Sequence, residues 1–252
     1  MLGACLARNV ANSGGGVGFD SHEMTERQVR ARLLSDQCER LGSRVPYSAI
    51  DRGLIGMNDV DVLKAAAEII DQMPLIIFDR GNRLDEIPAK IKTARRMLAR
   101  TGRELVLWIE DYLGLLSPTE RYRGNRVAEI GEISAALKHI AMQEGVPILA
   151  LHQLSRAVEG RKDKRPILSD LRESGSIEQD ADTVIFVYRE AYYHQRPGYS
   201  DDSDSERQAA FVRTQHLLEA IVAKARHGPI GTAELWCDTA LNAVRDRQRD
   251  SW

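Results

Sequence analysis

The chain has 252 residues, of which 43% are hydrophobic and 29% charged, and its formal net charge is −2. This composition argues against wholesale disorder, and the charge excludes a polycation that holds nucleic acid along its whole surface. The three cysteines stand far apart without a CxxC pair, so we expect free thiols and neither a disulfide framework nor a zinc site. No apolar run approaches the roughly 18 residues of a membrane span, and no signal-peptide pattern opens the sequence. The predicted location is therefore the cytoplasm.

The first third of the chain predicts helices around one glycine-rich turn. In order, the expected elements are a helix over 2–12, a turn over 13–16, a strand over 17–21, a helix over 25–41 and a helix over 59–73. The segment from Ser13 to Gly18 invites comparison with a phosphate-binding loop. Such a loop needs GxxxxGK[ST] and follows a strand, whereas this cluster lacks the Lys and the hydroxyl and precedes a strand. We therefore expect a plain turn.

The middle third alternates regularly between strands and helices. The expected elements are strands over 75–79, 104–109 and 146–151, separated by helices over 86–100 and 127–144. Continuous apolar strands joined by helices of about four turns are typical of a parallel sheet that is covered on both faces. The sequence thus predicts an α/β fold.

The last third is more polar. We expect a loop over 153–169, a short helix, a strand over 183–188, a flexible polar insertion over 195–208, and two strands over 219–225 and 232–236. We find no internal repeat and no linker, so residues 1–252 are expected to form a single domain.

Three polar side chains follow predicted strands and are candidates for catalysis. Asp111 follows a buried strand, and a carboxylate at the carboxyl edge of a parallel sheet can orient Mg²⁺ beside nucleotide phosphates. Glu23 could act as a general base, or could simply be an acidic residue before a helix. Gln153 could sense a γ-phosphate or cap a loop. Asp79 also follows a strand, which shows that position alone is a weak signal.

Basic side chains gather in two places. The segment 153–172 is rich in Arg and Lys, which suits either a solvated surface loop or contact with phosphates. Lys224 and Arg226 are two residues apart on a predicted strand and so share one face. A pair of this kind could neutralise phosphates across a subunit interface, as an arginine finger does.

Several blocks of the sequence, in order, resemble the motifs of DnaB-type replicative helicases. The longest is the Asp163–Pro166 segment with Ser169–Asp182. The shorter ones are Ser21–Met24, Asp111–Leu113, His152–Arg156 and Ala223–Pro229. The resemblance covers roughly residues 1–236. A recombinase-like or clock-type RecA relative is a weaker alternative, because the Ser169–Asp182 block speaks against it.

This resemblance implies a RecA-like motor: a mostly parallel sheet with helices on both faces. It also implies a homo-hexamer around single-stranded DNA, with ATP and Mg²⁺ bound between neighbouring subunits. A primase and a helicase loader are expected partners only of a longer form.

By position, the resemblance also implies roles for individual residues. Glu23 resembles the catalytic glutamate, Asp111 the Walker B aspartate that holds the metal, and Gln153 the sensor glutamine. Two cations resemble those presented to a neighbour's nucleotide, and three residues resemble a loop that grips the DNA backbone. These are Lys224 and Arg226 for the nucleotide, and Arg172, Glu173 and Gly175 for the DNA.

The sequence departs from the family pattern at four positions near the expected site. Glu110 replaces an apolar residue, and strand alternation should point its side chain away from the nucleotide. Asp20 stands in place of an aromatic residue, His22 in place of Leu, and His152 in place of Ser. We expect His152 to pack or to donate hydrogen bonds, not to bind a metal.

The beginning of the sequence departs most. Residues 2–11 match the helix that directly follows the Walker A loop in the family, so we expect the loop and the central strand before it to be missing from this sheet. Two interpretations stay open: a misplaced start of an active helicase motor, or a helicase-like remnant that binds DNA or joins a ring without hydrolysing ATP. An in-frame GxxxxGK[ST] upstream of Met1 would distinguish them.

Overall fold

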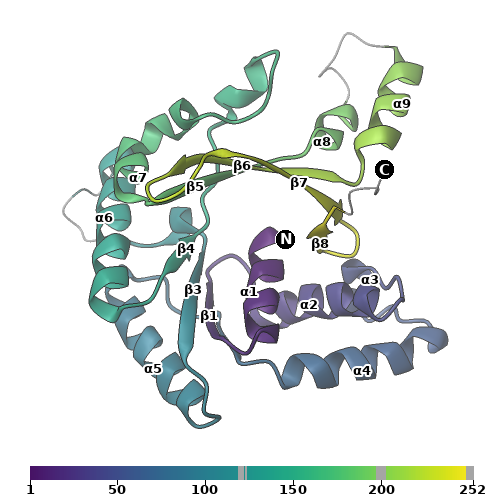
Figure 1. The fold of residues 1–252 in the computed structure, drawn as a ribbon, viewed down its shortest axis with the longest axis horizontal. Coiled ribbons are helices and arrows are strands. Elements are labelled where there is room, and N and C mark those ends of the chain that lie inside the picture. Colours follow the sequence, from purple (N-terminus) through teal and green to yellow (C-terminus); the bar gives the residue numbers. More distant parts are fainter. Residues whose placement is uncertain (119–121, 123, 197–202, 248–252) are drawn as a thin grey trace.

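The computed structural model describes residues 1–118, 122, 124–196 and 203–247, and within them the strands form two four-stranded sheets (Figure 1). The first sheet is parallel with the order β2-β1-β3-β4, and the second is antiparallel with the order β5-β6-β7-β8. The strands of the first sheet are β1 (Gly16–Ser21), β2 (Leu75–Phe78), β3 (Leu105–Asp111) and β4 (Ile148–Ala150). Those of the second are β5 (Thr183–Tyr188), β6 (Leu217–Ala225), β7 (Gly231–Asp238) and β8 (Ala243–Asp246).

Helices cover both faces of the first sheet, as the sequence predicts. One side carries α1 (Leu2–Asn12), α2 (Glu26–Arg40), α3 (Tyr47–Arg52) and α4 (Val60–Asp71), and the other carries α5 (Ile87–Ala99) and α6 (Arg126–Glu144) (Figure 1). Alternation along the strands supplies both cores. Val17, Phe19 and Ile109 face the first group of helices, while Trp108 faces α5 and α6.

Close packing explains the glycine-rich turn that resembles a phosphate loop. Gly14 has φ +91°, and the amide of Gly16 already donates to the carbonyl of Glu104 over 2.7 Å in the first sheet. A Cβ atom on Gly18 would lie 2.3 Å from the ring of Trp108. The prediction of a plain turn is confirmed, since these glycines serve backbone conformation and close approach.

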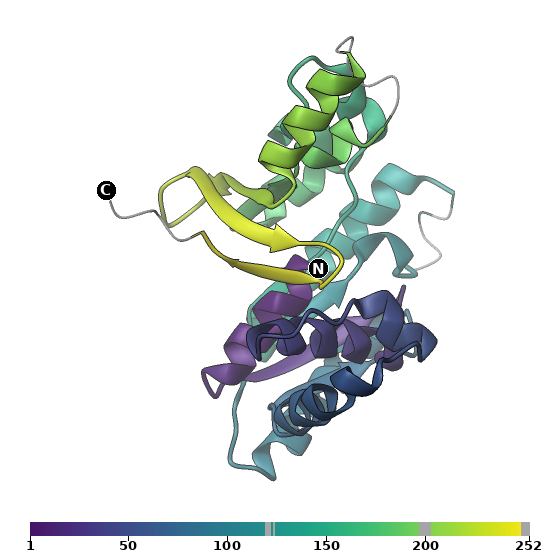
Figure 2. The same ribbon diagram turned by 90° about the vertical axis from the view of Figure 1, so that its right-hand side faces the viewer.

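The second sheet lies against the amino-terminal helix and carries its own helices (Figure 2). Cys5 of α1 packs with Leu218, Cys237 and Val244 in one apolar cluster. The helices of this part are α7 (Gly175–Asp180), α8 (Ala191–His194) and α9 (Asp204–Thr214). Short 3-10 turns occur at η1 (Met57–Asp59), η2 (Leu84–Glu86), η3 (Leu113–Leu115), η5 (Arg156–Gly160) and η6 (Leu168–Ser174).

The predicted elements are confirmed with shifts of a few residues at their ends, but some parts differ. Residues 204–208, expected in a loop, begin α9 instead. Ser203 and Glu206 form a reciprocal cap there, which satisfies backbone donors of the first turn. Residues 197–202 of the expected insertion lie outside the described residues. Helices α3 and α8 and strand β8 were not predicted from the sequence.

Two broader expectations concern the thiols and membranes. Cys5, Cys38 and Cys237 are free and buried, as predicted. Among the described residues, the longest apolar helices still fall short of what a membrane crossing requires.

Candidate functional site

A cleft of about 290 Å³ opens at the carboxyl ends of β1, β3 and β4. It brings together three predicted catalytic residues: Glu23 follows β1, Asp111 ends β3, and Gln153 follows β4. The carboxyl ends of parallel strands meet at one edge of a sheet, where ligands of open α/β folds bind. The remaining lining residues are Tyr112, Leu151 and His152.

The cleft is acidic and rich in oxygen donors. Burial raises the pKa of the Asp111 carboxyl above its usual value, and the charge of Glu23 adds to this effect. Burial also lowers the pKa of His152, with Arg126 contributing, which favours the neutral imidazole. Two carboxylates and one amide at the end of a parallel sheet can bind a hard cation or position a water molecule.

Local hydrogen bonds hold the segment that carries Glu23. The hydroxyl of Ser21 accepts from the amide of Met24 at 3.1 Å, and Thr25 caps α2. The carboxylate of Asp79 accepts from the amide of Glu26 at 2.9 Å. Asp79 therefore satisfies a free donor at the start of α2, which accounts for a carboxylate after β2 without a catalytic role.

Glu110 shares one face of β3 with Trp108, whose indole donates to it, and alternation sends Asp111 to the other face. Glu110 forms a buried cluster with Asp20 and His22, with 2.5 Å between His22 Nε2 and Glu110 Oε1 and 4.0 Å between His22 Nε2 and Asp20 Oδ2. Lys90 donates to both oxygens of Asp20 at 2.9 and 2.7 Å. Burial, together with the charge of Glu110, raises the pKa of Asp20 to about 6, although Lys90 and His22 act in the opposite direction.

The other departures from the family pattern thus separate into two groups. His152 lines the cleft, whereas Asp20 and His22 lie with Glu110 behind it. From the sequence, Asp20, His22 and His152 were all expected near one site, and Lys90 was not expected there. Strand spacing was the available signal, because Asp20 and His22 are two residues apart on one strand face.

Lys224 and Arg226 lie away from the cleft, side by side against α7. The Lys224 ammonium donates to the carbonyl of Glu178 at 2.5 Å. The half-exposed Arg226 donates to the carbonyl of Gln179 at 3.2 Å and pairs with Asp182 at 3.1 Å. Both cations therefore share one location, and no residue of the cleft is among these contacts.

The predicted DNA-binding residues occupy the junction of η6 and α7. Arg172 and Glu173 lie near the end of η6, and Gly175 begins α7, whose other end contacts Lys224 and Arg226. Within the basic stretch 153–172, Arg161 and Arg165 form ion pairs with other residues of the chain.

These two arginines form bidentate ion pairs. Arg161 donates to Asp170 at 3.0 and 2.8 Å, and Arg165 donates to Glu219 on β6 at 2.8 and 2.7 Å. The hydrogen bonds to Glu219 are the largest reason that the pKa of Arg165 is raised. Of the two alternatives left open for the stretch, a solvated loop and a phosphate contact, these ion pairs favour a structural role for Arg161 and Arg165.

Comparisons with known proteins agree on one family. Residues 1–246 match the sequence family described as DnaB-like helicase C terminal domain. The replicative DNA helicase DnaB of Rickettsia felis is 40% identical over 232 residues, which cover 90% of this chain and 44% of that protein. Its counterpart from Geobacillus stearothermophilus is 39% identical over 237 residues, covering 91% and 46%. The chain thus spans less than half the length of these relatives.

Solved structures of similar proteins point to the same family. One of them, described as an ATPase domain, superposes with a TM-score of 0.81 at 32% identity, covering 98% of this chain and 79% of that one. A DnaB-like replicative helicase, described together with its interactions with primase, has a TM-score of 0.80 at 32% identity, covering 96% and 53%.

Proposed function

Because the chain belongs to the DnaB-like helicase C-terminal domain family, we propose that it is the motor domain of a replicative DNA helicase. Such a motor couples ATP hydrolysis to movement along single-stranded DNA and to unwinding of the duplex. The observation that carries this proposal is the cleft, where Glu23, Asp111 and Gln153 project from three adjacent parallel strands.

The donors of the cleft fit a nucleotide with Mg²⁺. Asp111 offers a carboxylate oxygen, the ligand type that Mg²⁺ prefers, and it does so at the rim of an accessible cleft. When bound, Mg²⁺ would neutralise charge on the phosphates of ATP. Asp111 would hold the ion, and the amide of Gln153 would donate to phosphate oxygens.

Glu23 is suited to act as the general base. Its side chain is exposed at the mouth of the cleft and is held by the capped start of α2, so it can reach a water molecule beside a bound phosphate. Its carboxylate would accept the proton of that water as the water attacks. General bases of this kind contribute about 10²- to 10⁴-fold to rates.

Lys224 and Arg226 would act on a neighbour's nucleotide in a homo-hexameric ring. Their separation from the cleft of their own chain and the half-exposed guanidinium of Arg226 support a role across a subunit interface. The junction that carries Arg172, Glu173 and Gly175 would contact the DNA backbone, so both functions would meet at α7. One similar structure is a DnaB-like replicative helicase described with its interactions with primase. For the present chain, primase and a helicase loader are proposed partners only of a longer protein.

A second candidate is a protein that joins a ring or binds DNA without hydrolysing ATP. The 252 residues contain no GxxxxGK[ST], so they fit either candidate when taken by themselves. The two candidates differ in whether turnover appears when a phosphate-binding loop is supplied.

The test uses a chimera in which the segment preceding the matched region of the Geobacillus stearothermophilus relative is joined to this chain. We expect Mg²⁺-dependent ATPase activity that single-stranded DNA stimulates. Glu23→Gln and Asp111→Asn should each lower kcat by about 100-fold or more, and the matched control Asp79→Asn should not. Activity that survives Asp111→Asn, or that falls equally in Asp79→Asn, would contradict the proposed site.

Mixing experiments test the shared site. Arg226→Ala alone should abolish turnover while preserving nucleotide binding. Rings that mix this variant with Asp111→Asn should recover part of the turnover, because some interfaces then hold a complete site. Mixed rings that stay inactive at every ratio would count against a role for Arg226 across the interface.

A further inference from the structure

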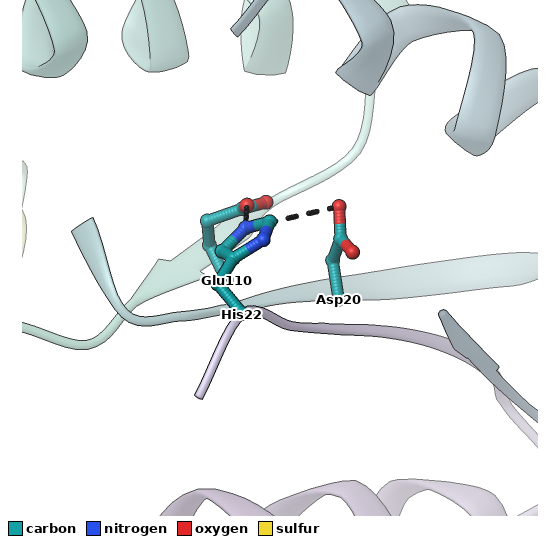
Figure 3. A group of neighbouring side chains, drawn as sticks. All are labelled: Asp20, His22 and Glu110. Atoms are coloured by element: carbon teal, nitrogen blue, oxygen red, sulfur yellow. Dashed lines mark hydrogen bonds and ion pairs between the residues drawn. The ribbon is translucent and has the colours of Figure 1, made fainter. Parts of the chain in front are cut away.

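Three side chains of metal-ligand type, Asp20, His22 and Glu110, point toward one another at the ends of β1 and β3, and none of them lines the cleft (Figure 3). Asp20 and Glu110 are register partners on the paired strands β1 and β3. His22 is two residues beyond Asp20, and its amide continues the ladder by donating to the carbonyl of Asp111 at 2.7 Å. Because side chains two apart on a strand share a face, the backbone itself brings the three groups together.

The spacing of the ligand atoms suits one ion. One nitrogen or oxygen from each residue lies within 4.8 Å of the others. Zinc with bonds of about 2.0–2.2 Å holds its ligand atoms about 3.4 Å apart. The 2.5 Å between His22 and Glu110 and the 4.0 Å between His22 and Asp20 lie on either side of that value. Side-chain shifts of about 1 Å would therefore make the three atoms equidistant from an ion.

The two buried carboxylates of this cluster favour the binding of a cation. The side chains of Asp20 and Glu110 are fully buried, and that of His22 is 2% exposed. Buried carboxylates need a paired positive charge. Lys90 supplies one from the solvent side: it is 11% exposed and also donates to the carbonyl of Gly81 at 2.7 Å.

Trp108 orients the ligand group of Glu110. Its indole donates to Glu110 Oε2 at 2.7 Å, which leaves Oε1 directed toward His22. Hydrogen bonds that fix a ligating carboxylate in this way are a common support of metal sites. Trp108 is itself fully buried, so the orientation of this carboxylate is built into the core.

We propose that Asp20, His22 and Glu110 form a binding site for one divalent transition-metal ion, with Lys90 competing for Asp20. On binding, the neutral Nε2 of His22 coordinates the ion, and the proton between His22 and Glu110 leaves to solvent. Lys90 releases Asp20 and keeps its contact with Gly81. One nitrogen and two oxygen donors favour Zn²⁺ or Co²⁺ over Mg²⁺, which prefers oxygen ligands and retains water.

The site is separate from the Mg²⁺ position proposed in the cleft. Asp111 lines the cleft and is not one of the three ligands, so its removal should leave them in place. An ion here would link β1 to β3 immediately before Glu23 and Asp111. It would thus limit the motion of the two strand ends that carry these cleft residues.

The experiment titrates the 252-residue chain with Zn²⁺ by calorimetry and with Co²⁺ by visible absorption. We expect one ion per chain, and a higher Tm with Zn²⁺ present. His22→Leu and Glu110→Gln should each weaken binding at least 100-fold. Lys90→Met should tighten it at least tenfold, because it removes the competitor and leaves Asp20 in need of a charge. Asp111→Asn and the exposed-histidine control His139→Ala should bind as the unmodified chain does.

Two results would overturn the proposal. One is the same affinity for Zn²⁺ in His22→Leu as in the unmodified chain, which would assign the ion to other ligands. The other is binding only in Lys90→Met, which would mean that the natural cluster is closed by its own lysine. Since circular dichroism reports whether each variant is folded, an unfolded His22→Leu chain would be replaced by His22→Gln, for which the same 100-fold loss is expected.

Discussion

A buried ion pair joins the first two helices, and breaking it should destabilise the fold far more than breaking a surface pair. Arg8 of α1 and Asp36 of α2 form this pair, and each side chain is 1% exposed. Arg245 of β8 binds the second oxygen of Asp36 at 2.6 Å. Burial raises the pKa of Asp36 and lowers that of Arg8, so desolvation outweighs attraction for both groups. The pair is thus costly to form, and costlier still to leave half-formed.

The expected magnitude follows from what each variant leaves behind. Asp36→Leu leaves the Arg8 guanidinium in the interior without its carboxylate, which costs about 3–5 kcal/mol. That is a large part of a typical total stability of about 5–15 kcal/mol. The double variant Arg8→Met/Asp36→Leu removes both charges and should recover most of this loss. The pair of Arg247 with Glu234 is a matched control, because its side chains are 55% and 56% exposed.

The assay is urea unfolding of both double-mutant cycles. We expect a coupling energy above about 2 kcal/mol for the buried pair and below about 1 kcal/mol for the exposed one. A buried coupling as small as that of the control would refute the reasoning. It would mean that water reaches Arg8 once Asp36 is gone, or that Arg245 and its neighbours rearrange to replace it.

Three further outcomes are expected. Gly18→Ala places a methyl group 2.3 Å from the ring of Trp108 and should lower the free energy of unfolding by about 1–3 kcal/mol in urea. In the control Gly231→Ala the new methyl group meets nothing within 4 Å, so stability should change by about 0.5 kcal/mol or less. Equal effects of the two substitutions would contradict the clash. Burial raises the pKa of all three cysteine thiols, that of Cys38 to about 11. The folded chain should therefore react with an aromatic disulfide reagent only on unfolding. Rapid labelling without urea would disprove the burial of the thiols. In the chimera, Arg172→Ala should weaken binding of single-stranded DNA equally for all sequences and flatten the salt dependence by about one unit or less, so a loss confined to some sequences would exclude a backbone contact.

Much of the first sheet could be predicted because its signals are local. Continuous apolar runs mark β2, β3 and β4, and helical periodicity marks α5 and α6. Parallel strands then bring Glu23, Asp111 and Gln153 to one edge without further information. The resemblance to DnaB-type helicases was confirmed by the family match over residues 1–246. The roles assigned to individual residues stay predictions.

What could not be predicted depends on partners distant in sequence. Arg165 pairs with Glu219, 54 residues away, so nothing near Arg165 shows that its charge is already engaged. The short strand β8 is defined by its pairing with β7, and the four residues alone carry little signal. The start of α9 was different. Ser203 followed by Glu206 is a capping signature that was present in the sequence and was outweighed by the run of acidic residues.

The end of β3 places two acidic residues on opposite faces of the first sheet. Glu110 and Asp111 are neighbours in sequence, and alternation alone sends one toward α5 and the other into the cleft. The sequence could therefore exclude Glu110 from the cleft, but it could not supply Lys90 and Trp108, which come from α5 and from the same strand face. Since a single backbone step separates the two faces, β3 can serve the proposed motor site on one side and the proposed ion site on the other. For this reason Asp111→Asn and Glu110→Gln should have separable effects, on turnover and on Zn²⁺ binding respectively.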